Sequence, residues 1–247
     1  MKTGNVFVCS MTIIGNRQAL ETLDGGNSLV LVTDGIHMIE GVKGAHSYLV
    51  TGSHLFLVDT GLPGQEHRIC NYLRAIRIDP SALEGIVLTH FDVDHVGSVV
   101  AMQKYAKCPI YAHALELPYV LGQEVRPGLK RWLPMVTRLP YGKLISPSAL
   151  RPLTDGELFD EWEVIHTPGH TPGHITLYRN GIAIVGDLFQ GGEIRTAPRY
   201  FTWNTDQLKE SVQTVIERPL RWILPGHGPA TPASSHWLDK LQKSLKK

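Results

Sequence analysis

The segment from His90 to His95 places four potential metal ligands within six residues, in the order His-x-Asp-x-Asp-His. Buried imidazoles and carboxylates each need a polar partner, since an unpaired buried polar group is strongly destabilising. A divalent metal ion supplies that partner for all four side chains at once. The alternative is a polar loop whose Asp side chains cap a helix. The density of ligand types favours a metal site, and metal-assisted hydrolysis is its most direct chemistry.

Three more candidate ligands follow along the chain, each after a short apolar strand or in a glycine-containing turn. His170 lies in the turn 167–174, where proline fixes φ and glycine allows close backbone approach. Asp187 directly follows the apolar run 181–186, and His227 follows the apolar stretch that ends at Leu224. Because the same arrangement recurs along one chain, we expect these side chains to meet in a single metal centre.

The elements that must position these residues alternate between strands and helices. Residues 85–88 predict a short buried strand before the first motif, and the stretch 96–105 predicts a helix after it. Asn180-Gly181 is a strong hairpin signal between two apolar runs. Further helices are expected over 66–78 and from the capping residue Asn204 to about Glu217. The ligands would therefore lie on loops that leave strands, where α/β proteins build their sites.

Six ordered motifs together resemble the metallo-β-lactamase-fold superfamily over roughly residues 36 to 230. They are Ala45-His46-Ser47-Tyr48-Leu49-Val50, Leu57-Val58-Asp59-Thr60-Gly61, the block His90 to His95, His170, Gly186-Asp187 and Pro225-Gly226-His227-Gly228. The resemblance implies an α/β fold, the αββα sandwich of the metallo-β-lactamase type, in which two mixed β-sheets are flanked by helices. It also implies a single domain over 1–247, with a substrate-capping insertion at about 116–151.

The same resemblance implies two divalent metal ions per chain and a role for each motif residue. One ion would be held by His90, Asp92 and His170. The other would be held by Asp94, His95 and His227, with Asp187 bridging both. Asp94 and Asp187 would also act in catalysis. Asp59 and His174 would orient the ligands without binding metal themselves.

Asp92 departs from the family pattern, which has His at this position. The substitution adds one negative charge, so the centre should be a weaker Lewis acid. An extra oxygen ligand also shifts preference from zinc toward harder ions. The flavodiiron branch of the superfamily has Glu here and carries iron. Zinc is expected from the family, and iron or manganese from Asp92.

The resemblance implies a dinuclear hydrolase in which a metal-bridging hydroxide attacks a small ester, thioester or lactone. Asp187 argues against the β-lactamase subclasses that have Cys at its position. Alternatives are a non-haem diiron redox enzyme acting on oxygen or persulfide, a phosphodiesterase of the same fold, and a metal-stabilised binding module without activity. The redox alternative would need a separate redox partner, because only about twenty residues follow His227.

Substrate contacts are harder to predict than ligands. We considered Tyr119, Phe189, Arg195 and Arg199 as residues that face the substrate. The segment 121–151 carries Arg131, Arg138 and other basic residues, and it could receive an anionic substrate. Alternatively, this segment is an irregular surface excursion whose basic residues keep it solvated.

Composition limits the other function classes. The chain of 247 residues has a formal net charge of +1, which offers no general attraction for nucleic acid or a membrane surface. Three widely spaced cysteines predict no disulfide framework and favour a reducing compartment. No apolar stretch reaches the length of a membrane span, and no cleavage site follows residues 6–14. We therefore expect a cytoplasmic protein with a small-molecule substrate; its oligomeric state stays open, a homodimer included.

Overall fold

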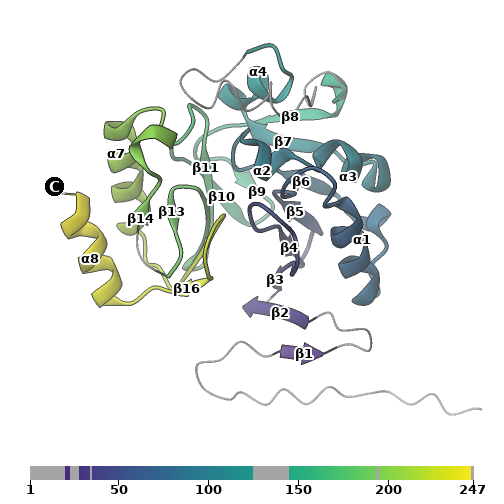
Figure 1. Ribbon diagram of the computed structural model, residues 1–247, viewed down its shortest axis with the longest axis horizontal. Helices are drawn as coiled ribbons and strands as arrows, with labels where there is room; N and C mark the ends of the chain where they lie inside the picture. The colour runs from purple at the N-terminus through teal and green to yellow at the C-terminus, as the bar shows by residue number, and fades with distance from the viewer. Residues whose placement is uncertain (1–19, 23–27, 34, 125–144, 193–194, 246–247) are drawn as a thin grey trace, which may run out of the picture.

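The computed structural model describes residues 20–22, 28–33, 35–124, 145–192 and 195–245. Two β-sheets stack face to face, and helices cover the outer face of each (Figure 1). This is the αββα sandwich predicted from the sequence. The predicted insertion lies largely at 125–144, outside the described residues, as does the N-terminal stretch 6–14, so the capping role of the insertion stays a prediction.

The first sheet contains eight strands in sequence order, antiparallel from β1 to β5 and parallel from β5 to β8. Its strands are β1 (Leu20–Thr22), β2 (Ser28–Thr33), β3 (Ile36–Met38), β4 (Tyr48–Val50), β5 (Phe56–Val58), β6 (Gly85–Val87), β7 (Ile110–His113) and β8 (Leu150–Leu153). The parallel half carries helices on its connections, and its strand ends all point to one edge of the sandwich.

The second sheet has the order β16-β15-β12-β11-β10-β9, with β12 and β15 parallel and the other pairs antiparallel. Its strands are β9 (Leu158–Phe159), β10 (Trp162–His166), β11 (Ile175–Arg179), β12 (Ile182–Gly186), β15 (Trp222–Pro225) and β16 (Thr231–Pro232). A separate two-stranded ribbon joins β13 (Phe189–Gln190) to β14 (Arg195–Thr196).

The longer helices lie on the two sides of the sandwich (Figure 1). The α-helices are α1 (Glu66–Ala75), α2 (Val93–Val96), α3 (Val99–Ala106), α4 (Leu117–Val120), α7 (Thr205–Ile216) and α8 (Ser235–Leu245). Short 3₁₀ turns lie at η1 (Pro80–Ala82), η2 (Ala114–Glu116), η4 (Pro147–Ala149) and η5 (Arg199–Phe201). None of the helices in the described part of the chain is long and apolar enough to cross a bilayer.

Alternation along the strands creates three apolar layers, because neighbouring residues of a strand face opposite sides of the sheet. In β5, Phe56 and Val58 pack into the layer between the sheets, while Leu57 packs under α1 and α3. In β12, Ile184 faces the inter-sheet layer and Val185 packs under α7 and α8. Strands such as β5 and β12 are therefore covered on one face by the other sheet and on the other face by helices.

Two local predictions are confirmed. Asn180 and Gly181 both have positive φ, at 49° and 84°, and they connect β11 to β12 in register Arg179↔Ile182. The Asn204 side chain accepts hydrogen bonds from the backbone N–H groups of Asp206 and Gln207, so it caps α7 as expected.

Two helix boundaries differ from the sequence prediction. The helix predicted over 66–78 ends at Ala75, and Arg77 takes a left-handed conformation. The helix predicted over 96–105 is split into α2 and α3 at Gly97-Ser98. At the break the backbone N–H groups of Gly97 and Ser98 donate to the Gly61 carbonyl and the Thr60 hydroxyl of a distant loop, at 2.9 Å and 3.3 Å.

Candidate metal centre

The predicted ligands lie on four loops and in the short helix α2, which contains Asp94 and His95, and all of these reach the same edge of the sandwich. The segment His90–His95 connects β6 of the first sheet to α2, and His170 lies in the turn between β10 and β11 of the second sheet. Asp187 directly follows β12, and His227 follows β15, the parallel neighbour of β12. Since the ends of adjacent parallel strands meet at one sheet edge, the fold brings together residues from position 90 to position 227.

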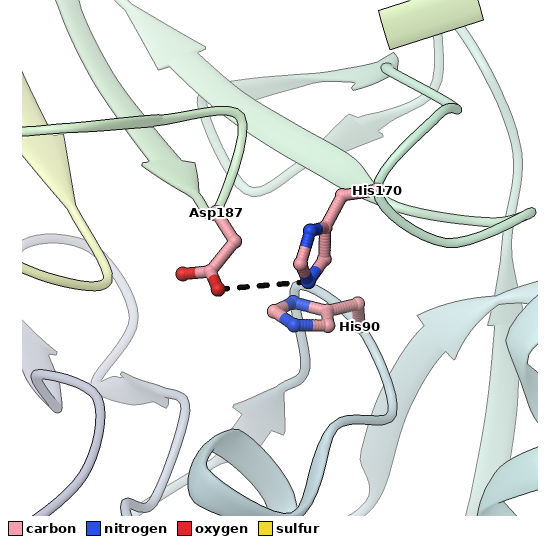
Figure 2. A group of neighbouring side chains, drawn as sticks. All are labelled: His90, His170 and Asp187. Atoms are coloured by element: carbon pink, nitrogen blue, oxygen red, sulfur yellow. Dashed lines mark ion pairs between the residues drawn. The ribbon is translucent and has the colours of Figure 1, made fainter. Parts of the chain in front are cut away.

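His90, His170 and Asp187 form what we call the first donor group, whose ligand atoms all lie within 4.8 Å of one another. Figure 2 shows the two imidazoles and the carboxylate pointing toward a common position. His170 Nε2 lies 3.5 Å from Asp187 Oδ2. Both histidines are almost completely buried, which limits their rotamers and holds the rings in place.

Asp94, His95 and His227 form the second donor group, again with ligand atoms within 4.8 Å. His227 Nε2 lies 3.1 Å from Asp94 Oδ2. Asp187 reaches this group with its other oxygen, since Oδ1 lies 3.2 Å from His95 Nε2 and 3.5 Å from His227 Nε2. The single carboxylate of Asp187 therefore faces both donor groups, one oxygen to each.

Asp92 lies beside the first donor group. Its Oδ2 atom is 3.0 Å from His170 Nε2 and 3.6 Å from His90 Nε2. The side chain is buried, with 7% of the residue exposed. The structure thus brings all seven predicted ligands together, and their coordination of metal ions stays a prediction.

The charges in this cluster shift the pKa values of its members strongly. Burial raises the pKa of Asp187, but the nearby His95 and His170 lower it more, so it lies well below its usual value. Burial lowers the pKa of His95, but Asp187 and Asp59 raise it well above the usual value. Burial, followed by the charge of His95, holds the pKa of His90 well below its usual value. The cluster is therefore a set of ionised carboxylates in close contact with buried imidazoles.

The donor set fits divalent metal ions. His90 Nε2, His95 Nε2 and Asp187 Oδ1 are buried and make no hydrogen bond within the described parts of the chain, although His95 Nε2 and Asp187 Oδ1 form an ion pair at 3.2 Å. A buried polar atom without a hydrogen-bond partner lowers the stability of the fold. A metal ion bound between these atoms would supply the missing partner. Imidazole nitrogens and carboxylate oxygens suit zinc, iron and manganese alike.

Asp59 orients His95 from behind. Its Oδ2 atom accepts a hydrogen bond from His95 Nδ1 at 2.8 Å and from the Thr89 hydroxyl at 2.7 Å. Its Oδ1 atom accepts from the backbone N–H of Thr89 at 2.9 Å. Because a carboxylate can only accept, Nδ1 of His95 carries a proton, and Nε2, which faces Asp187, is the nitrogen that would bind a metal ion after losing its own proton.

Substituting Asp59→Asn should weaken metal binding by about 10- to 100-fold, the usual cost of removing an outer partner of a metal-ligating histidine. The amide nitrogen would face the His95 Nδ1 proton and favour the other tautomer, in which Nε2 is protonated and cannot bind metal. Competition with a chromophoric chelator measures the affinity. Unchanged affinity in a folded Asp59→Asn protein would contradict this role.

His174 supports the centre without joining a donor group. Its Nδ1 atom lies 2.8 Å from the Thr167 hydroxyl, and its Nε2 atom accepts from the backbone N–H of Asp187 at 3.1 Å. Burial, followed by the charge of His170, lowers the pKa of His174 to about 3, so the ring is neutral. Gly186 takes φ +47°, and a Cβ atom on it would lie 2.7 Å from His174 Nε2, so there is no room for a side chain. His174 thus positions the backbone of Asp187.

Two residues near the centre were not identified from the sequence. His46 Nε2 donates a hydrogen bond of 2.8 Å to the carbonyl of Gly228, the residue after His227. Glu116 is fully buried and accepts hydrogen bonds from the loops of His90 and His170. The signal for Glu116 was its place just after a buried parallel strand, the same position that holds the ligands. A single Glu there does not stand out without the fold.

His113 offers a test of the buried electrostatics around the centre. It stacks on His166 at 4.1 Å and is 8% exposed. Burial, followed by the charge of His166, lowers its pKa to about 4. Below about pH 6.5 the unfolded chain binds a proton that the folded chain does not, so this group lowers stability as pH falls toward 4.

The metal-free protein should therefore lose stability on acidification, and His113→Gln should reduce that slope by up to about 1.4 kcal/mol per pH unit. Urea unfolding of both proteins at several values between pH 7 and pH 5 measures the difference in slope. Parallel pH profiles for the two proteins would mean that His113 titrates normally.

A cavity of about 460 Å³ opens over the centre, and Asp92, Asp94, His170, Asp187 and His227 contribute to its wall. This volume suits a small organic molecule. The remaining wall is mainly apolar and is formed by Leu62, Val93, Ala197, Pro198 and Phe201, with Gly44 and Gln190.

The four predicted substrate contacts have different outcomes. Phe189 is fully buried and packs on Trp237 at 5.5 Å, so it belongs to the core under α8 and not to the cavity wall. This position contradicts the prediction that Phe189 contacts the substrate. Arg199 is exposed on η5, next to the cavity residue Pro198. Tyr119 stacks on Phe91 at 4.4 Å, beside the ligand loop. The side chain of Arg195 lies outside what the structure describes, as do Arg131 and Arg138.

Comparison with known proteins agrees with this fold. The family model of the metallo-beta-lactamase superfamily matches residues 41–227. The probable metallo-hydrolase YflN of Bacillus subtilis is 30% identical over 244 residues, covering 88% of this chain and 89% of that protein. The hydroxyacylglutathione hydrolase of Idiomarina loihiensis is 26% identical over 185 residues, covering 74% of this chain and 61% of that protein.

Among solved structures, the di-iron-bound form of TTHA1623 superposes with a TM-score of 0.64 at 26% identity, covering 84% of this chain and 96% of that one. The family model spans every predicted ligand, from His90 to His227. The chain therefore belongs to the metallo-beta-lactamase superfamily and is a metal-dependent hydrolase.

Proposed function

We propose that this protein hydrolyses a small ester, thioester or lactone at a centre of two divalent metal ions. The observation that carries the proposal is the position of Asp187, whose two oxygens face two separate donor groups at the base of one cavity. His90, Asp92 and His170 would hold one ion, and Asp94, His95 and His227 the other, with Asp187 shared. When bound, the ions would supply Lewis acidity and an activated water molecule.

The protein's own residues would orient the reaction. Asp59 and His174 hold His95 and Asp187 in place through the hydrogen bonds described above. Burial raises the pKa of Asp94, but the hydrogen bond from His227 lowers it more, so the carboxylate is ionised. Asp94 lines the cavity and can therefore accept a proton from water and return it to the departing alcohol or thiol.

The apolar part of the cavity supports a carbonyl substrate with a hydrocarbon group. Leu62, Val93 and Phe201 flank the donor groups, and such surfaces favour an acyl or alkyl chain over water. Similarity to a hydroxyacylglutathione hydrolase supports an ester-like substrate, the thioester in particular.

The identity of the metal is a separate part of the proposal. Zinc is the expectation from the family, whereas the oxygen ligand Asp92 favours iron or manganese. The di-iron-bound form of TTHA1623 shows that a similar chain can carry iron.

The test combines elemental analysis with a substrate panel. The protein is purified without a metal-binding tag, its metals are counted, and the loaded and chelator-stripped forms are assayed. Probes are short aliphatic esters, S-acyl thioesters, γ-lactones and bis(p-nitrophenyl) phosphate. Metal-dependent turnover of an ester, thioester or lactone supports the proposal. Turnover of the phosphodiester alone would contradict it, and so would two irons with redox-sensitive absorbance and no hydrolysis.

A further inference from the structure

The two histidines of the first donor group come from different sheets, so their separation depends on how two loops are joined. His90 lies on the loop after β6 of the first sheet, and His170 on the turn between β10 and β11 of the second. The rings lie 4.8 Å apart between centroids. A shift of either loop by a fraction of this distance would change the geometry offered to a metal ion.

One buried carboxylate connects the two loops. Glu116 Oε2 accepts a hydrogen bond from the backbone N–H of Phe91 at 2.8 Å. Its Oε1 atom accepts from the backbone N–H of Gly173 at 2.6 Å. Phe91 lies between the ligands His90 and Asp92, and Gly173 lies three residues after His170. Each oxygen of Glu116 thus holds one ligand loop.

The surroundings of Glu116 are closely matched to this role. The side chain is 0% exposed and extends from the end of η2, where it leads into α4. A Cβ atom on Gly173 would lie 2.9 Å from Glu116 Cγ, from Glu116 N and from His113 Nδ1. The turn of His170 can therefore approach the carboxylate only because residue 173 is glycine.

Burying the Glu116 carboxylate costs free energy of folding, which the hydrogen bonds to it must offset. Burial raises the pKa of Glu116 to about 7, and the hydrogen bonds from Gly173 and Phe91 oppose that rise. A hydrophobic side chain of similar size would fill the space without this cost. It would, however, leave the N–H groups of Phe91 and Gly173 without this acceptor.

We propose that Glu116 is a positioning residue of the metal centre, which fixes the distance between the loops of His90 and His170 by accepting one backbone hydrogen bond from each. The inference rests on the proposed metal centre and extends it to a residue that touches no ligand side chain. Glu116 makes no corresponding hydrogen bond to the backbone of Asp94, His95 or His227 among the described contacts. Its loss should therefore weaken the metal site of His90, Asp92 and His170 more than that of Asp94, His95 and His227.

The experiment is a titration of metal-free protein with Co²⁺, followed by visible absorbance and by competition with a chelator. Glu116→Gln keeps the size of the side chain but turns an amide NH₂ toward one of the two N–H groups. Glu116→Asp keeps the charge but is one methylene too short to reach both loops. In both variants we expect the affinity for one Co²⁺ to fall by about 10- to 100-fold, with an altered spectrum for that ion. The other ion should bind with wild-type affinity.

Leu73→Ala is the matched control, because Leu73 is fully buried in α1 and belongs to neither ligand loop. It should lower the melting temperature while leaving both Co²⁺ affinities and the spectrum unchanged. The inference is overturned if Glu116→Gln and Glu116→Asp bind both ions as the wild type does. Equal weakening by Leu73→Ala at the same loss of stability would also overturn it.

These outcomes separate this inference from the proposed function. A wild type that binds two Co²⁺ ions but hydrolyses no carbonyl substrate would remove the proposed reaction and leave the role of Glu116 testable by spectrum and affinity. A wild type that hydrolyses esters, with Glu116 variants that bind metal normally, would remove only the positioning role.

Discussion

Asp187→Asn should lower kcat for the natural substrate by about a thousandfold, equivalent to about 4 kcal/mol of transition-state stabilisation. The two oxygens of Asp187 face the two donor groups at 3.5 Å from His170 Nε2 and 3.2 Å from His95 Nε2. An amide keeps the shape but offers one oxygen and one NH₂ group, and the nitrogen cannot serve as a ligand. One metal position should therefore lose its shared ligand and much of its affinity.

Kinetics and metal content should be measured on the same samples. We expect the metal content of Asp187→Asn to fall along with kcat, and added metal to restore activity only in part. The matched control is Asp239→Asn, an Asp on the exposed face of α8, which should leave both quantities unchanged. Wild-type kcat in Asp187→Asn would rule out a shared carboxylate in the reaction.

Asp92→His should shift metal preference toward zinc by about one to two orders of magnitude relative to manganese or iron. The change replaces an oxygen ligand with a nitrogen ligand. It also removes one negative charge beside His90, His170 and Asp187. Asp92 Oδ2 lies 3.0 Å from His170 Nε2, so the new imidazole would enter the same cluster.

The preference can be measured by equilibrating metal-free protein with Zn²⁺ and Mn²⁺ together and counting the bound ions. Asp92→Asn is the control that removes charge while keeping size, and it separates the effect of charge from that of the nitrogen ligand. Since Asp92 is buried, each variant is first checked for a wild-type melting transition. Identical zinc-to-manganese ratios in the wild type and Asp92→His would show that residue 92 does not select the metal.

Structural features that depend on neighbouring residues were predicted correctly from the sequence. Asn180-Gly181 produced the hairpin because two adjacent residues tolerate positive φ, and Asn204 capped α7 because its side chain reaches N–H groups two and three residues ahead. Both features depend on neighbours in sequence. The αββα sandwich was predicted from the family resemblance that six ordered motifs carry, and the structure has it.

Features that depend on distant packing were not predictable in the same way. At the break between α2 and α3, Gly97 and Ser98 donate hydrogen bonds to the loop of Thr60 and Gly61, and neither segment signals the other in the sequence. Phe189 was considered as a pocket residue, yet it packs on Trp237 in the core, because an aromatic residue after a strand fits either environment. Only the assembled fold distinguishes these placements.

By itself, the sequence determined which residue types could bind metal and where they follow strands, since ligand chemistry and strand periodicity are local properties. The family resemblance implied that Asp187 lies between two ligand groups and that Asp59 orients the site, but only the tertiary structure decided the distances within these groups and the place of Glu116 between two loops. The physical reason is that a metal centre is defined by distances of a few ångströms between loops far apart in the chain. Those distances are set by how the two sheets pack, which no single segment encodes.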